Sequence, residues 1–97
     1  MSTSDIIATV EFLSAEEGGR ETPTPQMRIG CIFVMDGIAL DCYLMLENHP
    51  PINPGETATI PIFFIDPLAK KLRFGIGTRF QLRDHRLIAN GLINKSE

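Results

Sequence analysis

The dipeptide Asp36-Gly37 lies between two apolar runs, Met27–Met35 and Ile38–Leu46, and constrains the fold more than any other feature of this chain. Asp-Gly suits the two-residue type I′ turn of a β-hairpin, because that turn needs positive φ at both central residues. With this turn as the loop, the residues that face one another across the hairpin are all apolar. The opposed pairs are Met35/Ile38, Phe33/Leu40, Cys31/Cys42 and Ile29/Leu44. The sequence therefore predicts an antiparallel hairpin in this register, with a longer turn as the alternative.

Two further strands are predicted from their patterns. In Ile6–Leu13, alternate residues from Ala8 to Phe12 are apolar and the others include polar side chains, which is typical of a half-buried strand. The segment Thr57–Ile65 is strongly apolar. Pro61 lacks a backbone donor, so we expect it to lie at an edge or a bulge.

The segment 71–83 is predicted as a long strand with a bend or bulge at Gly75 and Gly77. Apolar residues occupy one parity of this segment and mostly basic residues occupy the other. The apolar set is Leu72, Phe74, Ile76, Phe80 and Leu82, and the alternate set is Lys71, Arg73, Arg79, Gln81 and Arg83. We expect Asp84-His85 to form a tight turn into a last strand, Arg86–Ile93.

The fold class follows from these elements. Many short strands separated by turn residues, without a convincing helical period, predict an all-β barrel or sandwich. The 97 residues suit a single domain over 1–97, because they can fill one core but not two.

The connection after the first strand is Leu13–Pro23, which reads Leu-Ser-Ala-Glu-Glu-Gly-Gly-Arg-Glu-Thr-Pro. Gly18 and Gly19 lack a Cβ atom, so the backbone can turn sharply there at little steric cost. The simplest interpretation is a structured turn in which the acidic pair and the arginine stay solvated or pair locally.

This stretch resembles a signature near the start of the third, C-terminal β-barrel domain of elongation factor Tu. The matching residues are Leu13, Ser14, Glu16, Glu17, Gly18, Gly19, Arg20, Thr22 and Pro23. Further motifs agree in order: Pro54-Gly55-Glu56, Pro67-Leu68-Ala69, Gly77-Thr78-Arg79-Phe80 and Ile88-Ala89-Asn90-Gly91-Leu92-Ile93. The resemblance covers nearly the whole chain. It implies the closed six-stranded antiparallel Greek-key barrel of the translation-factor type.

In that family the third barrel contacts the T-stem of aminoacyl-tRNA, packs on the GTPase domain and helps to receive the nucleotide-exchange factor. The resemblance implies Arg20 and Arg28 as contact residues here. The chain departs from the family pattern at Glu21 (His in the family), Thr24-Pro25 (aromatic), Met27-Arg28-Ile29-Gly30 (Tyr-Arg-Pro-Gln) and Asp84-His85 (Gly-Gly). Glu21 puts negative charge where RNA contact would need none.

The net charge of −3 conceals an uneven distribution. Residues 1–66 hold 2 Arg against 10 Asp and Glu, a balance of −8, and residues 67–97 hold 7 Lys and Arg against 2 Asp and Glu, a balance of +5. We call the following set the basic row: Lys70, Lys71, Arg73, Arg79, Arg83 and Arg86. Its simplest interpretation is a solvated barrel face. Its functional interpretation is a stripe that binds the phosphates of structured RNA, or docks on an acidic protein.

Motifs for catalysis and metal binding are absent from this sequence. It has no Gly-x-x-x-x-Gly-Lys-Ser/Thr loop, and neither His49 nor His85 is placed by a local motif to activate a nucleophile. Cys31 and Cys42 are too few for a four-ligand zinc site, and we expect them to be buried and reduced. We therefore expect no enzymatic activity, no metal and no cofactor.

No secretory signal or membrane helix is recognisable, so the expected location is the cytoplasm, without a membrane partner. We expect a stand-alone, non-enzymatic binding module that resembles the C-terminal domain of elongation factor Tu. Its expected partner is tRNA or another structured RNA, or a translation-related protein. The alternative is a protein-interaction or regulatory domain without RNA contact, including one that associates with itself. The oligomeric state is left open.

Overall fold

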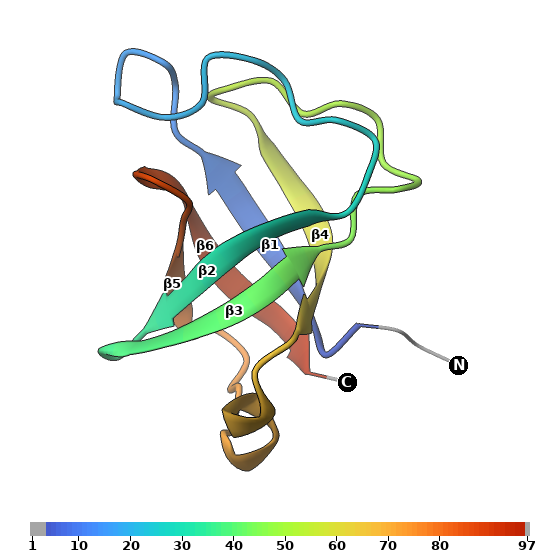
Figure 1. Ribbon diagram of the computed structural model, residues 1–97, viewed down its shortest axis with the longest axis vertical. Helices are drawn as coiled ribbons and strands as arrows, with labels where there is room; N and C mark the ends of the chain where they lie inside the picture. Colours follow the sequence, from blue (N-terminus) through green and yellow to red (C-terminus); the bar gives the residue numbers. More distant parts are fainter. Residues whose placement is uncertain (1–3, 97) are drawn as a thin grey trace.

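The computed structural model describes residues 4–96, which contain six strands and one short 3₁₀ helix. The elements are β1 (Ile6–Phe12), β2 (Ile29–Met35), β3 (Ile38–Leu44), β4 (Thr57–Phe64), η1 (Pro67–Lys71), β5 (Arg79–Arg83) and β6 (Leu87–Ser96). The strands close into an antiparallel barrel in the order β1-β4-β3-β2-β5-β6 (Figure 1). The predicted all-β, closed six-stranded antiparallel barrel is confirmed. Because β1 lies beside β4 and not beside β2, the order is compatible with a Greek key.

The β2–β3 hairpin forms at the predicted turn and in the predicted register. Asp36 and Gly37 have φ values of 48° and 77°, both positive as a type I′ turn requires. All four predicted pairs are present, from Met35/Ile38 at the turn to Ile29/Leu44 at the far end. These residues pack in or against the core. A slip of one residue would have moved the whole set to the outside.

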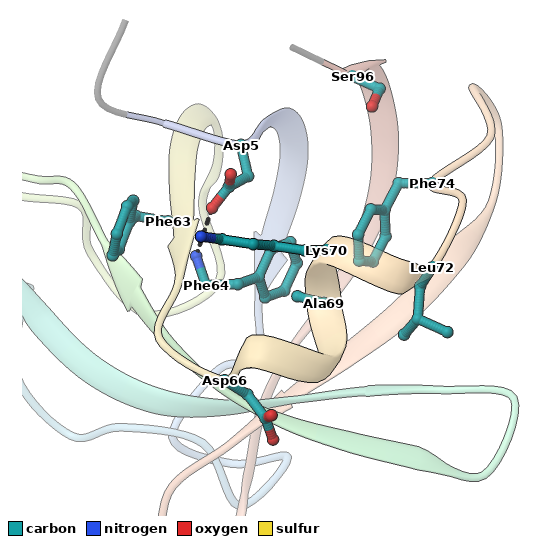
Figure 2. A pocket seen from close by; sticks show the side chains of 9 residues that line it. All are labelled: Asp5, Phe63, Phe64, Asp66, Ala69, Lys70, Leu72, Phe74 and Ser96. Carbon is teal, nitrogen blue, oxygen red and sulfur yellow. Dashed lines mark hydrogen bonds between the residues drawn. The ribbon is translucent and has the colours of Figure 1, made fainter.

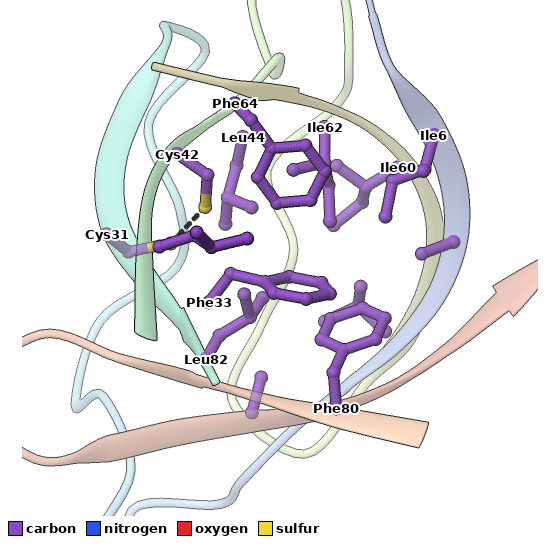
Figure 3. Packing of buried hydrophobic residues seen from close by; sticks show 14 of the residues in the cluster. Ile6, Cys31, Phe33, Cys42, Leu44, Ile60, Ile62, Phe64, Phe80 and Leu82 are labelled. Atoms are coloured by element: carbon purple, nitrogen blue, oxygen red, sulfur yellow. Dashed lines mark hydrogen bonds between the residues drawn. The ribbon is translucent and has the colours of Figure 1, made fainter. Parts of the chain in front are cut away.

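The barrel interior is filled by inward-facing side chains of every strand (Figure 3). An aromatic cluster lies at its centre. The ring of Phe33 stacks on Phe80 with centroids 4.3 Å apart, and meets Phe64 edge-on at 4.9 Å. Phe74 stacks on Phe64 at 4.7 Å. Such pairs add about 0.5–1.5 kcal/mol each beyond the burial of apolar area, so this cluster stabilises closure.

Two long loops are tied together at one end of the barrel. The Oγ1 atom of Thr24 accepts a hydrogen bond from the Ile52 N–H at 2.9 Å, and the Thr24 N–H donates to the Ile52 carbonyl at 3.0 Å. These bonds join the loop 13–28 to the loop 45–56, which lie together at the top of Figure 1. Helix η1 lies at the opposite end.

The prediction of one long strand over 71–83 is wrong. Helix η1 ends at Lys71, residues 72–78 form an irregular segment with a turn, and β5 begins only at Arg79. Between them Gly77 has a φ of 86° and the chain turns, so the predicted bend is confirmed but the strand around it is not. Ile76, predicted on the buried parity, is 77% exposed because it lies in this turn.

Pro61 lies where β4 separates from β3. Its carbonyl oxygen accepts a hydrogen bond from the Met45 N–H at 3.0 Å, and the register pairs β3 only with residues 62–64 of β4. The N and C=O groups of a strand residue point to the same side. The Pro61 nitrogen, which has no hydrogen to donate, therefore faces β3 at the point where the pairing of β3 with β4 ends. The predicted edge position of Pro61 is therefore confirmed locally, although the barrel as a whole is closed.

Candidate functional site

The turn after β1 is held by reciprocal hydrogen bonds between Ser14 and Glu17. The Ser14 N–H donates to Glu17 Oε1 at 3.0 Å, and the Glu17 N–H donates to Ser14 Oγ at 3.2 Å. The pKa of the Glu17 carboxyl is lowered by the hydrogen bond from the Ser14 backbone and, to a smaller extent, by a hydrogen bond with the Ser14 side chain. The predicted structured turn is confirmed, and its local pairing involves Glu17.

Three glycines of the Gly-Gly turn and of β6 are required by the fold. Gly18 has a φ of 90°, where a side chain is strained. A Cβ atom on Gly19 would collide with the carbonyl oxygen of Leu13, and one on Gly91 would collide with the ring of Phe80. Sterics therefore explain these positions, and they do not by themselves indicate a partner.

The Gly-Gly turn lies beside the β5–β6 turn because β1 pairs with β6. Phe12 is opposite Ala89, and the Leu13 N–H donates to the Ile88 carbonyl at 2.9 Å. Arg20 consequently reaches the tip of the last hairpin, which is distant from it in the sequence.

Arg20 and Arg86 line the same shallow pocket, of about 320 Å³. The other lining residues are Glu21, Thr22, Asp84, His85 and Ile88. Arg20 is half-buried, and its Nε is buried without a hydrogen-bond partner among residues 4–96. An unsatisfied buried donor costs about 1–3 kcal/mol, so an acceptor bound here would stabilise the site. Sequence reasoning named both arginines but missed Thr22 and His85, since no local signal links the two turns.

The β5–β6 turn differs from the prediction by one residue. Three residues, 84–86, separate the strands, and the register shifts between Leu82 and Arg83. Asp84 closes the turn: its Oδ1 accepts from the Arg86 N–H at 3.1 Å, and its N–H donates to the Arg86 carbonyl at 3.0 Å. The predicted turn at Asp84-His85 is therefore too short, because Arg86 belongs to the turn and lies at the pocket.

The basic row does not form one stripe. Arg79 and Arg83 are exposed at the two ends of β5, so they alone share a strand face as predicted. Lys71 is exposed on η1 and Arg73 in the segment after it. The row is divided because η1 and the turn at Gly77 replace the strand that would have aligned it.

Lys70 lies in a second pocket, of about 270 Å³, at the η1 end (Figure 2). Its side chain lies beside Phe64 in this view, and Asp5 and Asp66 also line the pocket. Asp5 Oδ2 accepts a hydrogen bond from the Phe64 N–H at 2.7 Å. A phosphate placed beside Lys70 would also lie beside the Asp5 carboxylate, so this end is less suited to RNA (Figure 2).

Arg28 lies apart from Arg20, on the outside of the β2–β3 hairpin. Its Nη2 is 3.3 Å from Glu47 Oε2, and its guanidinium lies over the ring of Tyr43 at 5.4 Å from the centroid. The structure thus separates the two residues that the resemblance implied as contacts.

Cys31 and Cys42 lie beside one another inside the barrel. Both are buried and free, with their Sγ atoms 3.5 Å apart. The hydrogen bond with Cys31, followed by burial, raises the pKa of the Cys42 thiol. Within the described range, no three His, Cys, Asp or Glu side chains gather in a way that could hold a metal ion.

Neither a protein-family model nor a curated protein matches this chain. Across residues 4–96, no helix has the length and apolar character needed to cross a membrane. Any functional conclusion therefore depends on the geometry of the sites described above.

Proposed function

We propose that this barrel is a non-enzymatic, cytoplasmic binding module linked to translation, and that it holds the phosphates of a structured RNA such as tRNA at the Arg20/Arg86 pocket. One observation carries the proposal: two arginines from distant turns line one pocket, and the buried Nε of Arg20 has no acceptor among the described residues. The guanidinium group offers a planar fork of donors that matches phosphate oxygens. The resemblance of the Gly-Gly-Arg motif to elongation factor Tu supports the same assignment.

Other residues around the pocket affect the expected strength of binding. Arg83 lies at the end of β5, just before the turn, and extends the positive charge. Glu21 and Asp84 line the pocket and oppose an anion, although Asp84 already accepts a hydrogen bond in the turn. We therefore expect modest affinity that depends strongly on salt.

The test is a fluorescence-anisotropy titration of tRNA at several salt concentrations. Each phosphate contact to a duplex contributes about 0.9 to the slope of log affinity against log salt. Arg86→Ala is expected to reduce that slope by about 1 and to weaken different RNA sequences equally. Arg73→Ala removes an exposed arginine two residues after η1, so it is the matched control and should leave the slope unchanged.

No binding at low salt, or an equal loss in Arg73→Ala, would contradict the RNA proposal. Arg86 is exposed, so its substitution should change stability by no more than about 0.5 kcal/mol. Arg20 is half-buried, so Arg20→Ala must be accompanied by a melting curve that shows the fold intact.

Protein contact without RNA is the second candidate function. One observation favours it: three large apolar side chains are exposed on the two strands that flank β3, namely Ile32 on β2, Phe63 on β4 and Ile65 directly after β4. Pure protein that associates through this surface but does not bind tRNA would favour this candidate over the first.

A further inference from the structure

The outside of the barrel over β2, β3 and β4 exposes three large apolar side chains. Ile32, Phe63 and Ile65 are 37%, 38% and 47% exposed. They lie on either side of β3, around Asp41 and Tyr43, because Ile32 pairs with Asp41, the Ile65 N–H donates to the Asp41 carbonyl at 2.9 Å, and Phe63 pairs with Tyr43. We call this surface, with Val34 and Ala39 at its margin, the apolar face. Exposed apolar surface of this kind commonly marks a contact with another molecule.

The apolar face contains one carboxylate and one guanidinium, on either side of Tyr43. Asp41 is exposed and makes no ion pair with any residue of the described chain. The Arg28 guanidinium lies over the Tyr43 ring. Gly30, opposite Tyr43, has no side chain, which leaves room for this arrangement. One negative and one positive side chain therefore lie on the apolar face, one on each side of the Tyr43 ring.

We propose that the apolar face is the interface of a homodimer whose two-fold axis passes near Tyr43. A two-fold interface uses the same patch on both copies, so any contact is made twice. An axis at Tyr43 places Arg28 of one copy against Asp41 of its partner, and Asp41 against the partner's Arg28. The current partner of Arg28 is Glu47, in a solvent-exposed ion pair at 3.3 Å. Exposed pairs of this kind contribute little, so the loss of this one costs little.

A stable interface takes about 800 Å² from each partner, which is roughly one seventh of the 5838 Å² surface of this chain. Every strand of the closed barrel has two neighbours, which leaves few free edges for strand addition. The inference rests on the second candidate function and is independent of RNA binding, because other elements line the Arg20/Arg86 pocket.

Sedimentation velocity over a range of concentrations tests the dimer. The wild-type chain of 10.8 kDa is expected to sediment at twice that mass as concentration rises. Asp41→Arg opposes two guanidinium groups across the axis, and Arg28→Asp opposes two carboxylates, so each variant is expected to weaken association by about tenfold or more. A mixture of the two variants restores association, because the heterodimer has opposite charges at both contacts.

Glu11→Arg makes the same change of charge on the exposed side of β1, and should leave association unchanged. Circular dichroism and melting curves check that each variant is folded. Standard interfaces bind in the micromolar range or tighter, so a wild-type chain that stays monomeric at about 0.1 mM overturns the dimer. Association that survives both single variants, or that mixing fails to restore, also overturns it. A monomeric chain that binds a different protein through this face would overturn the dimer and leave the second candidate function standing.

Discussion

In both the β2–β3 and the β5–β6 hairpin, a glycine lies directly opposite an aromatic residue. Gly30 is opposite Tyr43 on the outside of the barrel, and Gly91 is opposite Phe80 on the inside. A Cβ atom on Gly30 would lie 3.6 Å from the Tyr43 ring, an ordinary contact, whereas one on Gly91 would collide with the Phe80 ring. The same pair of residue types is therefore replaceable in one hairpin and required in the other.

The outward faces of the two hairpins differ as well. The β5–β6 hairpin exposes Arg79, Arg83 and Asn90, while the β2–β3 hairpin exposes Ile32 and Ala39. In both hairpins alternate side chains point inward, because both hairpins fill the same core. Residues on the outside do not affect closure of the barrel. The comparison teaches that the two hairpins share their interior chemistry and diverge where partners could bind.

The largest effect should come from the two glycines. We expect Gly91→Ala to cost about 1–3 kcal/mol of unfolding free energy, because the added methyl overpacks the core against Phe80. Gly30→Ala, the matched change on the outside of β2, should stay within about 0.5 kcal/mol. Urea denaturation of both variants measures the difference. Equal losses would show that the two glycines play the same role and would break the comparison.

The next prediction concerns the unfolding free energy at alkaline pH, which depends on the thiols of the β2–β3 hairpin. The pKa of Cys42 is raised, so the folded chain keeps a proton that the unfolded chain releases. Its contribution to stability is complete below the unfolded thiol pKa of about 8.5 and falls as pH rises above it, by up to about 1.4 kcal/mol per pH unit.

This fall in stability should be smaller in Cys42→Val, which removes the titrating thiol with little change in volume. Denaturation between pH 7 and 10 compares the two proteins. Identical pH dependence of the unfolding free energy in wild type and variant would refute the assignment to Cys42.

The smallest effect should come from the turns. Gly37 has a φ of 77°, so Gly37→Ala is expected to cost about 1 kcal/mol and lower the melting temperature by about 4–8 °C. No residue of the turn 84–86 has positive φ, so His85→Ala should stay within about 0.5 kcal/mol. Thermal melting of both variants provides the measurement. A loss in His85→Ala as large as that in Gly37→Ala would remove the distinction between the turns.

Local patterns predicted one region well and another poorly. The β2–β3 hairpin was predictable because Asp36-Gly37 sets the turn and alternation sets the register, both over short distances. The segment 71–83 has the same alternation, but it begins where η1 ends, and Gly77 turns the chain before β5. Parity alone does not distinguish a continuous strand from an irregular segment with a turn.

The sequence by itself determined the all-β class, the hairpin at Asp36-Gly37 and the need for glycine in the first turn. These features depend on backbone sterics and alternation, which neighbouring residues express. Only the tertiary structure decided that Arg20 and Arg86 line one pocket and that Phe63 lies beside Tyr43. Both arrangements follow from strand order. Hydrogen bonds between strands use backbone groups that nearly every residue has, so no local pattern states which strands pair, and packing of the whole core selects the order.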